Sequence, residues 1–553
     1  MESQPPGFQP RTFSVKLWPP SASTRQMLLE RMAKNLSTES IFSRKYGLLS
    51  KEEAFENARQ IEETCFVIAN DHFENEPDGD GSSAVQLYAK ETSKLILEVL
   101  KRGPRQKEDV EVTPNNATSV VPHKTVFDIS GGRRDFLEAD EARELLSPLT
   151  EDGNAYTKIC FSNRSFGVDA ARVAEPILKN LSKQLLEVDL SDFIAGRPED
   201  DALEVMRIFS SALENCGLKY LNLSNNAMGE KGVRAFEALF KSQNHLEELY
   251  LMNDGISEEA AKALCELIPS TEKLRILHFH NNMTGDEGGV AISEVLKRSP
   301  QIEDFRCSST RVASEGGIAL AEALGTSTHL KKLDLRDNIF GVEAGIALSG
   351  TIEKHGGLTE LYLSYLNLED EGAIAIFDAL RKSDSRLEIL EIAGNDITAK
   401  AVPHLTAYLS AKQTLKKLSL SENELKDEGA VLIGKVLEDS NPQLKELDFS
   451  TNAVKRVGAR CLARAAVTNK PDFVLLNIDG NAISEEGIDE VKEILKSAKR
   501  YVNVLGPLDE NDPEGGGEDD GDENDEEDEK DDDGDEEENE DDVDSKLQNL
   551  SFQ

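Results

Sequence analysis

The chain has 553 residues, too many for one compact hydrophobic core, so several units are expected. Much of its formal charge of −43 lies near the end, because residues 509–544 hold 25 Asp and Glu with one Lys, a net of −24. The remaining −19 is still acidic, which disfavours nucleic acid and anionic membranes as direct partners and favours a basic protein surface.

Residues 1–12 carry no apolar stretch, so they are predicted to be disordered and lack a secretory signal. Residues 13–104 predict a small helical bundle. In it, Ser50 and Glu53 form a capping box that opens a helix. The apolar residues of that helix recur at helical spacing and are expected on one side: Phe55, Ala58, Ile61, Cys65 and Ile68.

Residues 105–122 contain Pro114 and Pro122 without apolar periodicity, and they predict a linker. Residues 123–155 then precede a long repetitive region and are expected to form its N-terminal cap. Six cysteines lie far apart without a CxxC pair, which favours buried thiols in a reducing compartment. No apolar run is long enough to span a bilayer, so we expect no direct membrane insertion.

A pattern L-x-x-L-x-L-x-x-N-x-L recurs between residues 156 and 500, as in LKYLNLSNNAM from Leu218 and LKKLSLSENEL from Leu415. The third apolar position recurs at steps of 28 or 29 residues, apart from one step of 33. The anchors are Phe161, Leu190, Leu223, Leu251, Phe279, Cys307, Leu335, Leu363, Ile392, Leu420, Phe449 and Ile478.

The L-x-L part alternates with period two and predicts a short strand, whereas the residues after it have the period of a helix. This predicts an α/β leucine-rich-repeat solenoid with a concave parallel sheet and convex helices. The Asn at the ninth position of the pattern is expected to satisfy backbone groups where the chain leaves the strand. We call the stacked ninth-position residues of successive repeats the ladder. Residues 501–553 cannot bury a core and are predicted to be an acidic, disordered tail.

No phosphate-binding loop, dinucleotide fingerprint, HExxH motif or nucleophile elbow occurs, so the chain is not expected to bind a nucleotide itself. His278 and His280 are predicted to face the concave side of one strand. Without a third ligand they are more typical of contact residues than of a metal site. The concave face as a whole, with aromatic and Arg residues, is typical of a protein-binding surface.

The stretch FSVKLWPPSASTRQMLLERMAKNLSTESIFSRKYGLLSKEEAF resembles the WPP domain, named for its motif Trp18-Pro19-Pro20. The repeats with an acidic tail resemble the GTPase-activating protein of the small GTPase Ran, most specifically in LSDFIAGRPEDDALEVM, LNLSNNAMGEKGVRAF and LYLMNDGIS. In this order the two parts resemble the plant-type Ran GTPase-activating protein family over nearly the whole chain.

The resemblance implies an activator of GTP-bound Ran rather than an enzyme. GTP and Mg²⁺ would belong to Ran, and the chain would need neither a cofactor nor a metal. In the family, an Asn at a strand end fixes the catalytic glutamine of the GTPase, and its match here is Asn253. Counted from Leu246, Asn253 is the eighth position and Asp254 the ninth, so Asp254 is expected in the ladder and Asn253 is free to point outward.

Arg197 matches an exposed family Arg that contacts the GTPase without entering its nucleotide site. Two residues later the family can carry a Lys where this chain has Glu199, so a second basic contact is in doubt. Further contacts with the GTPase are expected from the concave residues Tyr250, His280, Arg306 and Arg336.

By resemblance, Trp18, Pro19 and Pro20 belong to a targeting domain that docks on coiled-coil nuclear-envelope proteins. The expected location is the cytoplasm and the cytoplasmic face of the envelope, with cell-division structures in mitosis as a further site. Trp18 also has a simpler interpretation, as a core anchor of the bundle. The acidic tail has two interpretations: a solvated, disordered segment without a partner, or a segment that attracts a basic surface of Ran electrostatically.

Two other functions are open, and a third conflicts with the sequence. A non-catalytic repeat scaffold with the WPP region as its address is the main alternative. A ribonuclease inhibitor shares the repeat length but is typically richer in Cys. A secreted receptor conflicts with the absence of a signal peptide and with the sequon at Asn222, which falls within a predicted strand.

Overall fold

The computed structural model describes residues 22–37, 49–75, 82–102, 125–130, 134–498 and 504–513. Its contacts divide the chain into two units, Met1–Val120 and Val121–Gln553. Trp18, Pro19 and Pro20 lie outside the described residues, as do 514–553 of the acidic tail. Among the described residues, no helix has the length and apolar character needed to cross a membrane.

The first unit is helical, as predicted. Ser50 accepts a hydrogen bond from the backbone N–H of Glu53 at 3.2 Å and so caps the second helix. Ala58 and Cys65 from that helix are fully buried in the core of the unit, whereas Phe55 is 46% exposed and Ile68 39% exposed, so the expected apolar side is only partly covered. The helices are α1 (Ala22–Ser37), α3 (Lys51–Asn75) and α4 (Ser82–Arg102).

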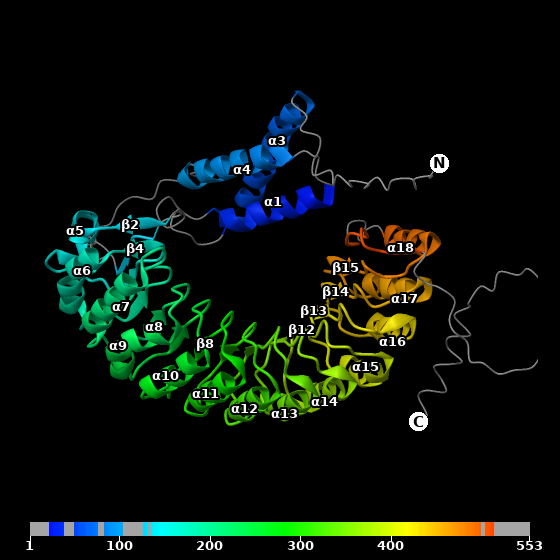
Figure 1. The fold of residues 1–553 in the computed structure, drawn as a ribbon. Helices are drawn as coiled ribbons and strands as arrows, with labels where there is room; N and C mark the ends of the chain where they lie inside the picture. The colour runs from blue at the N-terminus through cyan, green and yellow to red at the C-terminus, as the bar shows by residue number, and fades with distance from the viewer. Residues whose placement is uncertain are drawn as a thin grey trace, which may run out of the picture. The chain divides into compact units, whose positions relative to one another are not determined.

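The second unit is a solenoid whose main sheet of parallel strands lies on the inner side of an arc (Figure 1). Neighbouring strands pair in register one repeat apart, so that Leu249 lies opposite Leu277 and Tyr250 opposite His278. In chain order along the sheet the strands are β1 (Val126–Asp128), β3 (Lys158–Cys160), β5 (Glu187–Asp189), β6 (Tyr220–Asn222), β7 (Glu248–Tyr250), β8 (Ile276–His278), β9 (Asp304–Arg306), β10 (Lys332–Asp334), β11 (Glu360–Tyr362), β12 (Ile389–Glu391), β13 (Lys417–Ser419), β14 (Glu446–Asp448) and β15 (Leu475–Asn477).

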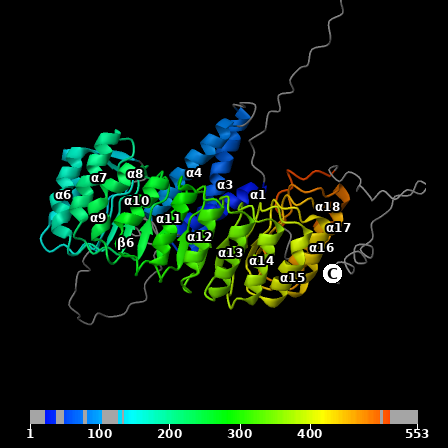
Figure 2. The same cartoon turned by 60° about the horizontal axis from the view of Figure 1, so that its bottom comes forward.

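Helices cover the outer side of the arc and stack side by side along it, which is clearest in Figure 2. The leucine-rich-repeat architecture is therefore confirmed. The helices are α5 (Ala139–Leu146), α6 (Val168–Leu181), α7 (Glu199–Leu213), α8 (Gly229–Ala235), α9 (Glu237–Ser242), α10 (Glu258–Leu267), α11 (Gly285–Lys297), α12 (Ser314–Leu324), α13 (Gly341–Lys354), α14 (Glu369–Lys382), α15 (Val402–Ala411), α16 (Lys426–Asp439), α17 (Arg456–Val467) and α18 (Glu485–Ser497), with short 3-10 turns η1 (Ser147–Thr150) and η2 (Ala399–Ala401).

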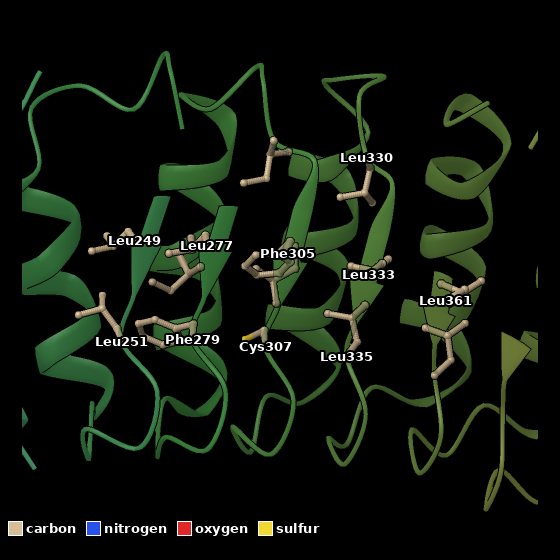
Figure 3. Packing of buried hydrophobic residues seen from close by; sticks show 14 of the residues in the cluster. Leu249, Leu251, Leu277, Phe279, Phe305, Cys307, Leu330, Leu333, Leu335 and Leu361 are labelled. Atoms are coloured by element: carbon tan, nitrogen blue, oxygen red, sulfur yellow. The ribbon is translucent and has the colours of Figure 1, made fainter. Parts of the chain in front are cut away.

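The core lies between sheet and helices and is built from two apolar residues per strand region. In most repeats the middle strand residue is buried and its neighbours are half-exposed, which is the period-two pattern predicted from L-x-L. Figure 3 shows Leu249 with Leu251 and Leu277 with Phe279 in successive layers. Because each buried leucine stabilises the fold by roughly 2 kcal/mol only when a neighbouring repeat covers it, stability comes from stacking.

Both ends of the solenoid extend further than a simple repeat count implies. The expected cap, residues 123–155, contributes β1 to the main sheet, and β2 (Asp135–Leu137) pairs with β4 (Arg164–Phe166) in a separate small sheet. Residues 504–513, expected to be disordered tail, instead pack on the last repeat. There Leu505 forms a parallel β-bridge with Leu476. The side chain of Asn511 donates to the carbonyl of Ile483 at 2.8 Å and accepts from its N–H at 3.1 Å.

Candidate functional site

The candidate site lies in the loop that leaves β7. After the buried anchor Leu251 the chain passes Met252 and reaches Asn253, whose side chain is exposed. Its φ of 57° lies in the left-handed region, which Asn tolerates better than most residues. Its backbone N–H donates to His280 of the next repeat at 3.1 Å. The exposed carboxamide therefore stands on a backbone that the next repeat restrains.

Asp254 occupies the buried ladder position, as the repeat count predicts. Its side chain is fully buried, and its Oδ1 accepts a hydrogen bond from the backbone N–H of Asn226 at 2.8 Å. Its own N–H donates to Oδ1 of Asn282 at 3.0 Å, so it links the repeats on both sides. The structure thus confirms that Asp254 is the structural residue and Asn253 the outward one.

Asn253 is the middle member of a row of three exposed asparagines from consecutive repeats. Its Nδ2 donates to Oδ1 of Asn225 at 3.1 Å, and its Oδ1 accepts from Nδ2 of Asn281 at 3.1 Å. The sequence prediction missed the outer two members. Aligning Asn225-Asn226, Asn253-Asp254 and Asn281-Asn282 by repeat position would have found them.

Together the two contacts of the asparagine row use one donor and one acceptor of the Asn253 carboxamide. A carboxamide has two N–H groups and two lone pairs, so one of each remains for a partner. The neighbours also define which edge of the amide is the donor and which the acceptor. The arrangement therefore suits a side chain that orients a second hydrogen-bonding group.

A hollow of about 540 Å³ adjoins the asparagine row and includes Asn253 in its wall. Its lining also contains Arg311, Asp337 and two apolar side chains that are unusually open to solvent. These are Met283, 50% exposed, and Ile339, 59% exposed. A recess with exposed apolar groups and a few charges beside the row is typical of a surface that receives another protein.

The concave residues predicted as contacts lie at the ends of neighbouring strands or two residues beyond them. The ring of Tyr250 packs edge-on against His278 with centroids 4.8 Å apart, and His278 lies near His280 at 6.1 Å. Burial and then the neighbouring His278 lower the pKa of His280, which disfavours its charged form. Both His278 and His280 are half-buried rather than freely exposed.

The two concave arginines are each paired with carboxylates. Arg306 binds Asp304 through Nε and Nη2, both at 3.0 Å. Arg336 binds Asp334 at 2.8 Å and Glu391 at 2.9 Å, and its guanidinium lies 4.7 Å from the ring centre of Tyr362. These pairs neutralise much of the positive charge that the sequence assigns to this face.

The expectation that Arg197 is exposed is wrong, because its side chain is only 13% exposed. Its Nη1 pairs with Glu138 at 2.5 Å, its Nη2 donates to the backbone carbonyls of Leu137 and Ser165, and its guanidinium lies 5.0 Å from the ring centre of Phe136. Arg197 ties the N-terminal cap to the first repeats and shares none of these partners with Asn253.

Comparison with known proteins agrees with both parts of the chain. A WPP domain matches residues 14–110, and a leucine-rich repeat matches 214–236, 326–349 and 411–434. RAN GTPase-activating protein 2 of Arabidopsis thaliana is 63% identical over 507 residues, which cover 92% of each chain. The chain belongs to the RAN GTPase-activating protein family.

Two other relatives match different shares of this chain, one most of it and the other a short part. RAN GTPase-activating protein 1 of Arabidopsis thaliana is 68% identical over 401 residues, covering 72% of this chain and 74% of the relative. MFP1 attachment factor 1 of Solanum lycopersicum is 40% identical over 93 residues, covering 17% of this chain and 60% of the relative. The first match spans most of the chain and the second is no longer than a single domain.

Proposed function

We propose that this protein stimulates GTP hydrolysis by Ran and that Asn253 is the residue that acts on the GTPase. The observation that carries the proposal is the exposed carboxamide of Asn253, held between Asn225 and Asn281 on a left-handed turn. The family membership supports Ran as the GTPase, and the geometry of the asparagine row supports Asn253 as the acting residue. The chain needs no nucleotide or metal of its own, because Ran brings GTP and Mg²⁺.

Asn253 would act by restraint rather than by bond-making. GTP hydrolysis is slow when the attacking water and the glutamine that orients it are mobile. The free N–H and lone pair of Asn253 would hold that glutamine side chain in one geometry. Because the row already restrains Asn253, little additional ordering is needed when Ran binds.

Ran would dock across the recess beside Asn253 and the neighbouring concave residues. The exposed side chains of Met283 and Ile339 offer apolar area for this contact. Tyr250, His280, Arg306 and Arg336 would contribute polar and aromatic contacts, and the arginines would exchange part of their internal pairing for partner groups. A contact through Arg197 would require its guanidinium to leave Glu138.

The direct test is single-turnover GTP hydrolysis by Ran with the full chain. Asn253→Ala should lower the stimulated rate about 100-fold, the typical loss when one positioned donor is removed. Thr451→Ala is the matched control, since Thr451 occupies the same turn position with a φ of 53° in a later repeat. Asn253→Asp keeps the shape but cannot donate, so it should fail like the Ala variant.

The scaffold alternative makes the opposite forecast. If the full chain binds Ran but leaves its hydrolysis rate unchanged, the protein is a scaffold. If stimulation is normal in Asn253→Ala, the activator function stands and the assignment of Asn253 is lost.

We also infer that the WPP domain brings the activator to the cytoplasmic face of the nuclear envelope by binding a coiled-coil protein there. The match of residues 14–110 supports a targeting domain. A fluorescent fusion of the full chain should mark the nuclear rim, and Trp18→Ala with Pro19→Ala should disperse it. An unchanged circular dichroism spectrum in that variant separates a lost contact from an unfolded bundle, and an unchanged rim signal would refute the role.

A further inference from the structure

The buried ladder of the solenoid has one consistent chemical rule. In the seven ladder asparagines and in Thr310, the side chain donates a hydrogen bond to the backbone carbonyl three residues earlier. The distances run from 2.6 Å at Asn226 to 3.3 Å at Asn452. At Leu366 the ladder side chain is apolar and leaves no polar atom unpaired.

Asp254 departs from this rule. Its Oδ1 accepts from the N–H of Asn226 at 2.8 Å, as the oxygen of a ladder asparagine does. Its Oδ2 is buried without a hydrogen-bond partner. Because Oδ1 takes the role of the asparagine oxygen, Oδ2 corresponds to the donating nitrogen of a ladder asparagine. An ionised carboxylate there would turn a negative oxygen toward backbone carbonyl oxygens, which is unfavourable in a buried setting.

We propose that Asp254 is a neutral carboxylic acid in the folded protein, that its O–H replaces the ladder N–H, and that it thereby positions Asn253. The second half of this proposal rests on the proposed function. Burial raises the pKa of Asp254 well above its usual range, and the hydrogen bond from Asn226 acts in the opposite direction. Its hydrogen-bonded neighbours Asn226 and Asn282 are uncharged, and among the described residues no charged side chain contributes to the shift.

The link to Asn253 is direct because the two residues share a peptide bond. The N–H of Asp254 donates to Asn282, and its carbonyl accepts from the N–H of Gly229 at 3.0 Å. With the ladder O–H in place, three contacts restrain the turn: the two backbone hydrogen bonds to the neighbouring repeats and the internal hydrogen bond that the O–H donates. Once Asp254 ionises, the internal donor is lost and the turn that carries Asn253 is less restrained.

The first experiment measures stability against pH for the full chain and for Asp254→Asn. The pKa of Asp254 is raised in the folded state, so its contribution is complete below about pH 4, the unfolded value, and declines as pH rises through the folded pKa. Asparagine does not titrate. The difference in urea midpoint between the two proteins should therefore be small near pH 4 and grow in favour of Asp254→Asn at higher pH.

Two further measurements keep this test decisive. Asn282→Asp should introduce the same pH-dependent loss one repeat later, because it places an acid in an equivalent ladder position. The infrared difference spectrum between the full chain and Asp254→Asn at pH 7 should contain the carbonyl band of a protonated carboxylic acid. A midpoint difference that does not vary with pH, or the absence of that band, would overturn the neutral-acid assignment.

The positioning role has its own readout. With the same Ran preparation, the ratio of stimulated rates for Asp254→Asn over the native chain should rise with pH, in kcat and not in KM. If the ratio of stimulated rates does not change with pH while the midpoint difference does, Asp254 is a neutral acid without a positioning role. If neither protein stimulates hydrolysis at any pH, the proposed function fails, whereas the stability and infrared results still decide the protonation state.

Discussion

The loops after β6, β7 and β8 present Asn225, Asn253 and Asn281, whereas the corresponding loops after β13 and β14 present Glu422 and Thr451. The backbone is the same in both stretches, since all five residues have φ between 53° and 66°. The early stretch has an acid in its ladder and a row of carboxamides outside it. The later stretch has an unbroken asparagine ladder of Asn395, Asn423, Asn452 and Asn481.

This contrast separates two tasks that one repeat performs. The buried side chain at the ninth position stabilises the turn, and the side chain at the eighth position is the one that the turn exposes. In the later repeats the inside is regular and the outside is unrelated from one repeat to the next. In the early repeats the outside is regular, which is expected where a surface is built for one partner.

The largest expected effect is a loss of stability in the later ladder. The side chain of Asn423 accepts from the backbone N–H groups of Asn395 and Ile397 and donates to the carbonyl of Leu420. Asn423→Ala would leave these buried groups unpaired and should cost about 3 kcal/mol in urea unfolding. Thr451→Ala is the exposed control. Loss of Ran stimulation in Asn423→Ala below its unfolding midpoint would contradict the separation of tasks.

A smaller loss is expected on the concave face of the early repeats. Burial alone would raise the pKa of Asp304, but the imidazole of His278, whose Nε2 lies 3.2 Å from Oδ1, and the hydrogen bonds from Arg306 bring it to about 2. A lowered folded pKa gives stability that is present above about pH 4 and lost as pH falls through about 2. Asp304→Asn should therefore cost roughly 2 kcal/mol at pH 7 and little near pH 2.

That measurement uses the urea midpoint at a series of pH values. The two variants should show opposite pH trends: as pH rises, Asp304→Asn should lose stability relative to the native chain, whereas Asp254→Asn should gain it. Equal costs of Asp304→Asn at pH 7 and pH 2 would mean that the ion pairs of the concave cluster do not stabilise the fold.

The smallest expected effect concerns the asparagine row. Asn281→Ala removes one hydrogen bond to the Asn253 carboxamide, worth about 1 kcal/mol, so the stimulated rate should fall about fivefold while KM is unchanged. Single-turnover hydrolysis over a range of activator concentrations separates the two constants. A rise in KM at constant kcat would make Asn281 a binding residue instead.

Much of the fold was predictable from the repeat alone. Twelve anchors at near-constant spacing determine which side chains are buried, because each repeat must use the same two faces as its neighbours. The same count predicts Asp254 inside and Asn253 outside. The order of β3 and of β5 to β15 along the main sheet follows from chain order, since a solenoid offers each strand only adjacent partners.

The sequence by itself therefore determined the architecture, the family resemblance and the outward position of Asn253, because these depend on local period and motif. Tertiary structure decided what depends on neighbours one repeat away. Only there do Asn225 and Asn281 restrain Asn253, Arg197 become largely buried beside Glu138, and Oδ2 of Asp254 lack a partner. A linear pattern records which residue stands at each position, whereas hydrogen bonds between repeats depend on which atoms the stacking brings within reach.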